Sequence, residues 1–569
     1  MSTNTLATNY IPEDFTVTSW DAVEPFYKEL QQREINSVTD LEHWLADRSA
    51  LDAFLSEDFG WRYIKMNCDT ENKALTEDFT FFVTEIQPKC APFEDSLNRK
   101  FILSQYVDLL DKKQYDVMIR SVKKQLELYR EENIPVFTEI ENTQHEYGTI
   151  TGSIVVEVDG NELTLPQAAS YFKSTDRAKR EEVFNKISIR RLQDKEVLNE
   201  LFDKLLALRD KVAINADYKN FRDYMFDALG RFDYTVDDCY NFHESVKQYV
   251  KPICDTLDAK RKAALGYDTL YPWDTEVDIE GKEPLKPSES TAEMLDKAIQ
   301  CFYDIDTYFG DCLKQMREMG RLDLESRKGK APGGFNYPLY KSGVPFIYMN
   351  AANNMRDLIT IVHEGGHAIH SFLTQDLALT EFKSTPSEIA EVASMAMELI
   401  SMEHWQVFFT NEEDFKRAKR YQLEKAISGL PWIAQIDKFQ HWIYQNPTQT
   451  NEERNAYWLT LCSEFGSSVI DWSNLQEALA YQWQKQLHLY EVPFYYIEYG
   501  FAQLGAIAIW RNYKNDPDKT LQQYKGALAL GYTRSLPELY EVAGIRFDFS
   551  PEYIKELAKF VQEEIEKIK

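Results

Sequence analysis

The pattern of hydrophobic and polar residues along the chain predicts a mainly α-helical protein. Apolar residues recur at helical spacing through most of residues 19–130, 165–265 and 355–569, with few breakers. Two short stretches have the pattern of β-strands instead. Apolar and polar residues alternate in residues 150–165 around the turn sequence DGN, which predicts a β-hairpin, and PFIYMNA at residues 345–351 predicts a strand. We therefore expect many helices and little β-sheet.

Composition and charge narrow the range of partners and compartments. The formal net charge of −29 disfavours nucleic acid and anionic membrane surfaces as partners. Seven scattered cysteines without a CxxC pair are typical of thiols in a reducing compartment. The N-terminal residues lack the basic and apolar pattern of a signal peptide, and the apolar runs are shorter than the roughly 20 residues of a membrane span. We expect a soluble cytoplasmic protein.

The segment richest in candidate chemistry is VHEGGHAIH, within a predicted amphipathic helix over residues 355–373. His363 and His367 are four residues apart, so their imidazoles project from one face and could bind a single Zn²⁺. Glu364 lies beside the first histidine, where it could take a proton from water at the metal. Glycine is costly inside a helix, so the two glycines between these residues suggest that another element packs closely there.

A second predicted helix, within residues 384–398, supplies carboxylates for a third metal ligand. Glu388, Glu391 and Glu398 lie on one face at helical spacing, among apolar residues. A catalytic zinc needs a third protein ligand and an open position, and both Glu388 and Glu391 are candidates. Thr385 and Glu388 have the spacing of a capping box at the start of this helix.

Three motifs together point to a known family. They are HEGGH at His363–His367, EVAS at Glu391–Ser394 and HLYEVPFYYIEYG at His488–Gly500. In these motifs the chain resembles the thimet oligopeptidase and oligoendopeptidase F family of zinc metallopeptidases, and its length and helical N-terminal region suit the oligoendopeptidase F branch. The resemblance implies an N-terminal helical region with the hairpin over residues 1–185 and a catalytic domain over residues 186–569.

The resemblance also implies a fold and a metal centre. The fold would be a large multi-helix metallopeptidase, with a small β-sheet near the active site and a deep substrate channel between lobes. One Zn²⁺ would be held by His363, His367 and Glu391, with Glu364 as the general base. Glu398 is a candidate acceptor for the N–H group of a ligand imidazole.

The late motif supplies further candidate catalytic residues. By resemblance, His488, Tyr496 and Tyr499 would donate hydrogen bonds to the transition state, and the neighbouring Tyr495 is an alternative to either tyrosine. We also expect the substrate backbone to pair with the edge of the strand at residues 345–351.

The function implied is that of a zinc-dependent oligoendopeptidase, which hydrolyses internal bonds of short unstructured peptides. One alternative is a zinc carboxypeptidase of similar fold, since the pattern HExxH with a downstream glutamate also serves enzymes that trim C-termini. The other is a catalytically silent peptide-binding protein.

Overall fold

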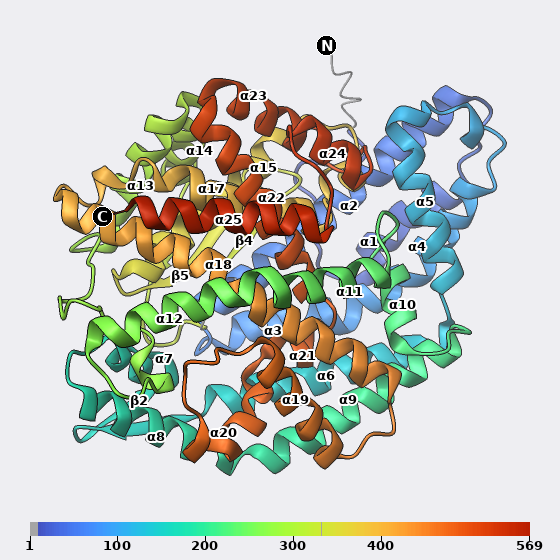
Figure 1. Cartoon of the computed structure of the whole chain (residues 1–569). Helices are drawn as coiled ribbons and strands as arrows, with labels where there is room; N and C mark the ends of the chain where they lie inside the picture. The colour runs from blue at the N-terminus through green and yellow to red at the C-terminus, as the bar shows by residue number, and fades with distance from the viewer. Residues whose placement is uncertain (1–8, 332, 569) are drawn as a thin grey trace. The chain divides into compact units, whose positions relative to one another are not determined.

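The computed structural model describes residues 9–331 and 333–568. Helices make up most of the chain, and the prediction of a mainly α-helical protein is confirmed (Figure 1). The chain folds into two compact units, each assembled from separate stretches. Unit 1 comprises residues 1–129, 286–419 and 505–547, and unit 2 comprises residues 130–285, 420–504 and 548–569. The predicted domain boundary at residue 185 stays a prediction.

Unit 1 contains the N-terminal helices, a small sheet and the two helices on which the metal ligands were predicted. Its elements are α1 (Trp20–Gln32), α2 (Val38–Cys68), α3 (Lys73–Phe81), α4 (Gln87–Ile102), α5 (Lys112–Leu128), α13 (Thr291–Ile305), α14 (Thr307–Glu318), β3 (Leu322–Glu325), β4 (Phe335–Tyr337), β5 (Phe346–Ala351), α15 (Met355–Thr374), α16 (Thr380–Lys383), α17 (Ser387–Met402), α23 (Pro517–Leu528) and α24 (Leu536–Val542). One apolar core joins α1, α2, α4 and α5, and Phe382 of α16 packs into it.

Unit 2 is built from helices and one hairpin. Its elements are α6 (Ile134–Gly152), β1 (Val155–Val158), β2 (Asn161–Thr164), α7 (Leu165–Ala169), α8 (Arg177–Gln193), α9 (Lys195–Asn215), α10 (Phe221–Ala228), α11 (Val236–Ser245), α12 (Lys251–Leu265), α19 (Asn451–Phe465), α20 (Gln476–Ala480), α21 (Leu487–Glu491) and α25 (Pro551–Lys567). Helices α18 (Glu412–Gln445) and α22 (Tyr496–Asn515) contribute residues to both units. No helix in the described part of the chain has the length and hydropathy of a membrane span.

The three-stranded sheet of unit 1 confirms the predicted strand and corrects the predicted place of substrate pairing. Strand β5 matches the predicted segment, but it is the central strand, parallel to β3 and antiparallel to β4. The expectation that substrate pairs with an edge of β5 is wrong for residues 346–348, because β3 and β4 lie on the two sides of the strand there. For residues 349–351, which have no partner in β4, it stays a prediction. The edges of this sheet are β3 and β4.

The predicted hairpin of unit 2 is confirmed over residues 155–164 and forms part of a core, but residues 150–152 of the predicted segment are the last residues of α6. Asp159 and Gly160, in the turn between β1 and β2, both have positive φ angles, of 54° and 76°. This is the backbone of the tight turns that Asp-Gly favours. Val156 and Val158 are buried and pack in one cluster with Val183 of α8.

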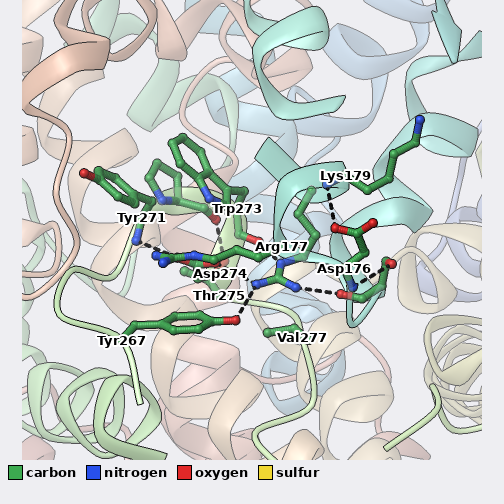
Figure 2. Close-up of polar contacts among 12 residues, drawn as sticks. Asp176, Arg177, Lys179, Tyr267, Tyr271, Trp273, Asp274, Thr275 and Val277 are labelled. Carbon is green, nitrogen blue, oxygen red and sulfur yellow. Dashed lines mark hydrogen bonds and ion pairs between the residues drawn. The ribbon is translucent and has the colours of Figure 1, made fainter. Parts of the chain in front are cut away.

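A buried ion-pair network fixes the start of α8 against the Pro-rich loop of residues 267–290 (Figure 2). The carboxylate of Asp274 accepts hydrogen bonds from Arg177 and Arg180, each at 2.7 Å. Asp274 and the Arg180 side chain are fully buried, and Arg180 also donates to the Trp273 carbonyl at 3.0 Å. Because buried charges need such partners, the network ties the part of this loop around Asp274 to α8 within unit 2.

Candidate metal centre

The helix that carries the two histidines begins at a well-formed cap. The side chain of Asn354 accepts a hydrogen bond from the N–H of Arg356, and Asp357 accepts one from the N–H of Asn354, each at 2.9 Å. This reciprocal capping satisfies donors that the first turn of a helix leaves without a partner. Helix α15 covers the predicted range, one residue longer at its end.

A close approach between α15 and α17 explains one of the two glycines. A Cβ atom built on Gly366 would lie 2.6 Å from the Cα of Ser394 and 2.7 Å from the carbonyl oxygen of Ala393. Only glycine permits the two backbones to come this close. Gly365 has a different neighbour, because its Cβ would lie 2.5 Å from the ring of Phe302 on α13.

Three predicted metal ligands are brought together by this packing. The Nε2 atom of His363 lies 3.4 Å from Oε2 of Glu391, and Nε2 of His367 lies 3.7 Å from the same oxygen. One donor atom from each residue lies within 4.8 Å of the others. Ligands on a tetrahedral Zn²⁺, with bonds of about 2.0–2.1 Å, are roughly 3.3–3.4 Å apart. The spacing of these side chains therefore fits one zinc ion.

Two neighbouring side chains orient the ligands. The Nδ1 atom of His363 lies 2.7 Å from a carboxylate oxygen of Glu398, so Nδ1 carries the proton and Nε2 is available to a metal. The hydroxyl of Ser394 donates to Oε2 of Glu391 at 3.0 Å. Ser394 was not predicted, although its position three residues after Glu391 on a helix would place it nearby.

The burial of the site shifts the pKa values of its groups in the protein without metal. Burial raises the pKa of Glu364 to about 7 and lowers that of His367 to about 4. Burial also opposes protonation of His363, but the carboxylates of Glu391 and Glu398 outweigh it and raise its pKa well above the usual value. A cation would take the place of that proton between the imidazoles and the carboxylate.

The start of α17 differs from the sequence prediction in its cap. The same helix also decides which of two glutamates lies beside the histidines. The predicted capping box of Thr385 and Glu388 is wrong, because Pro386 is the N-cap and no side chain caps it. The N–H of Thr385 instead donates to the carbonyl of Lys383 in the preceding turn. Of the two candidate third ligands, Glu391 is the one grouped with the histidines, and Glu388 is buried outside that group.

The remaining predicted catalytic residues form an aromatic cluster in unit 2. The His488 ring lies 4.9 Å from that of Tyr496, and 5.9 Å from those of Tyr495 and Tyr499, measured between centroids. The Nδ1 atom of His488 lies 2.8 Å from the amide nitrogen of Gln486, a contact that sequence reasoning missed. The catalytic roles of these residues rest on the family resemblance.

Comparison with known proteins identifies the family. Residues 170–559 match the model of peptidase family M3, and residues 12–129 match the model of the peptidase M3 N-terminal domain. The chain belongs to peptidase family M3. This confirms the resemblance drawn from the three motifs, and family M3 membership indicates a metallopeptidase.

Relatives within family M3 are distant in sequence but close in fold. The chain is 22% identical to oligopeptidase PepF of Bacillus subtilis over 430 residues, which is 74% of this chain and 62% of the relative. It is 22% identical to an oligoendopeptidase F homolog of Borreliella burgdorferi over 420 residues, 72% of this chain and 67% of the relative.

Solved structures extend the likeness to the whole fold. A structure of PZ peptidase A with an inhibitor superposes with a TM-score of 0.92 at 22% identity, covering 98% of this chain and 99% of that one. Oligoendopeptidase F from Enterococcus faecium gives a TM-score of 0.65 at 14% identity, covering 96% of this chain and 98% of that one. At these identities the structures establish the fold alone.

Proposed function

We propose that the chain is a zinc-dependent oligoendopeptidase that hydrolyses internal bonds of short, unstructured peptides in the cytoplasm. The observation that carries the proposal is the convergence of His363, His367 and Glu391 on one point, with Glu364 next to it in the helix. Two imidazoles and one carboxylate are a donor set typical of catalytic zinc, and they leave one coordination position open. The preference for short peptides rests on the relatives, which are named oligopeptidases and oligoendopeptidases.

Peptide hydrolysis needs a group that takes a proton from the attacking water and gives one to the leaving amine, and we assign this role to Glu364. Zinc bound at this site would lower the pKa of water and polarise the scissile carbonyl. The carboxylate of Glu364 accepts the proton of the attacking water and returns it to the leaving amine. His488, Tyr496 and Tyr499 are the proposed hydrogen-bond donors to the developing oxyanion, and one such donor typically contributes about 2.7–4 kcal/mol.

The sheet of unit 1 offers a place for the substrate backbone. Strand β4 is an edge strand, and the side chain of Asn336 on it lies 3.5 Å from the carbonyl oxygen of Glu364. A peptide added alongside β4 would form main-chain hydrogen bonds that do not depend on its sequence. We therefore assign substrate positioning to the edge of β4 instead of β5.

The test uses internally quenched fluorescent peptides whose C-termini are amidated. We expect internal cleavage that stops when a chelator is added and returns with zinc, and mass spectrometry of the products locates the bonds. Release of single C-terminal residues from unblocked peptides alone would identify a carboxypeptidase. If the zinc-loaded protein binds these peptides but does not hydrolyse them, the alternative of a catalytically silent peptide-binding protein would hold.

A further inference from the structure

Unit 2 contains a second cluster of metal-ligating side chains, on two helices that play no part in the proposed peptidase chemistry. Cys239 and His243 are four residues apart on α11, and Asp437 and His441 are four residues apart on α18. Residues at this spacing share one face of a helix. The two faces meet, because Nε2 of His243 lies 2.8 Å from Oδ2 of Asp437.

The donor atoms are close enough to share one ion. Nε2 of His441 lies 3.2 Å from the same oxygen of Asp437. One donor atom from each of Cys239, Asp437 and His441 lies within 4.8 Å of the others. Ligand atoms on a tetrahedral zinc, with bonds of about 2.0 Å to nitrogen and about 2.3 Å to sulfur, are separated by roughly 3.3–3.8 Å. Small side-chain rotations would bring Cys239, Asp437 and His441 to the required spacing. His243 lies outside this group of three, in contact with Asp437, and would have to rotate further to become a fourth ligand.

The cluster without an ion leaves buried polar atoms unsatisfied. His243 and Asp437 are fully buried, and His441 is 1% exposed. Among the described residues, Oδ1 of Asp437, Nδ1 of His243 and both ring nitrogens of His441 have no hydrogen-bond partner. A buried polar atom without a partner costs about 1–3 kcal/mol.

We propose that Cys239, His243, Asp437 and His441 form a structural zinc site. Sulfur and imidazole ligands with one carboxylate suit tetrahedral Zn²⁺. A thiolate and a carboxylate cancel the charge of the ion, so the buried site is neutral when both imidazoles are neutral. Four protein ligands leave no position for water or substrate, which makes the site structural. The ion would join α11 to α18 within unit 2.

The first test counts zinc in the purified full chain by elemental mass spectrometry, after zinc loading and removal of excess metal. We expect the Cys239→Ser and His441→Ala variants to contain one zinc fewer per chain than the wild type. The Cys254→Ser variant is the matched control, because it removes another thiol of unit 2, and it should keep the wild-type count. Equal zinc content in all four proteins would overturn the proposal.

The second test does not depend on the stability of the variants. Cobalt bound by a thiolate gives a charge-transfer band in the near ultraviolet, and the proposed peptidase site of two histidines and a glutamate has no thiolate. The wild-type protein loaded with Co²⁺ should therefore show this band, whether or not the peptidase site binds metal. A cobalt-loaded wild type without the band, or a Cys239→Ser variant that keeps it, would show that the cluster binds no metal through Cys239.

Discussion

Gly366 is the position at which one methyl group should disturb the metal centre most. An alanine there would place its Cβ atom 2.6 Å from the Cα of Ser394 and 2.7 Å from the carbonyl oxygen of Ala393. Both atoms belong to the backbone of α17, so rotation of a side chain cannot relieve the overlap. Helix α17 must move away from α15, or α15 must bend.

The size of that movement follows from ordinary contact distances. Carbon atoms pack at roughly 3.5–4.0 Å, so the helices would separate by about 1 Å. Glu391 lies on α17 while His363 and His367 lie on α15, and zinc–ligand distances tolerate only about 0.2 Å. We expect Gly366→Ala to lower the free energy of unfolding by about 1–3 kcal/mol. Zinc affinity should fall by at least about 10-fold, the scale of damage seen when ligand orientation is lost.

The assay measures zinc affinity by competition with a chromogenic chelator, together with thermal unfolding and peptide turnover. Gly365→Ala is the first control, because its Cβ would meet the Phe302 ring of α13, so it should lower stability with a smaller effect on zinc. Gly429→Ala is the second, since no atom lies within 4 Å and the helix should gain about 0.4–1 kcal/mol. A Gly366→Ala variant that binds zinc as tightly as Gly365→Ala would refute the reasoning.

Three further substitutions test single contacts. Glu364→Gln should lower turnover at least about 100-fold while zinc content stays unchanged, and a fully active variant would rule out its role as general base. Glu398→Ala removes the acceptor of the His363 N–H and should weaken zinc binding about 10–100-fold, measured by chelator competition; unchanged affinity would contradict this. Asp274→Ala leaves two arginines without their carboxylate and should cost about 3–5 kcal/mol in urea unfolding. The exposed Asp268 of the same loop is the control, and an equal loss in Asp268→Ala would contradict the assignment.

The helix of the metal centre was predictable because its signals are local. The spacing of His363 and His367, the apolar residues before them and the glycines all lie within a few turns, and a pattern of period 3.6 specifies which side chains share a face. The hairpin around Asp159 and Gly160 was predictable for the same reason, since its turn chemistry is contained in two residues.

Features that depend on contacts between distant segments were not predictable in this way. The sequence of β5 predicts a strand but not the partners on its two sides, so its central position was missed. The glycine pair signalled a close neighbour, yet nothing in it distinguished the backbone of α17, at Gly366, from the ring of Phe302, at Gly365. At Thr385, where the motif predicted a capping box, the N–H group instead donates to the carbonyl of Lys383, the last residue of the short helix α16.

The two clusters of candidate metal ligands differ in how well the sequence predicts them, because their residues are spaced differently along the chain. His363 and His367 belong to a motif of five residues, so the amino-acid sequence alone is enough to predict a metal site at this helix. Cys239 with His243 and Asp437 with His441 have the same spacing of four, but the pairs are 194 residues apart between His243 and Asp437. A single i,i+4 pair of potential ligands is common on helices and has little meaning alone. Only the fold, by placing α11 against α18 within unit 2, brings Cys239, Asp437 and His441 together and sets His243 against Asp437.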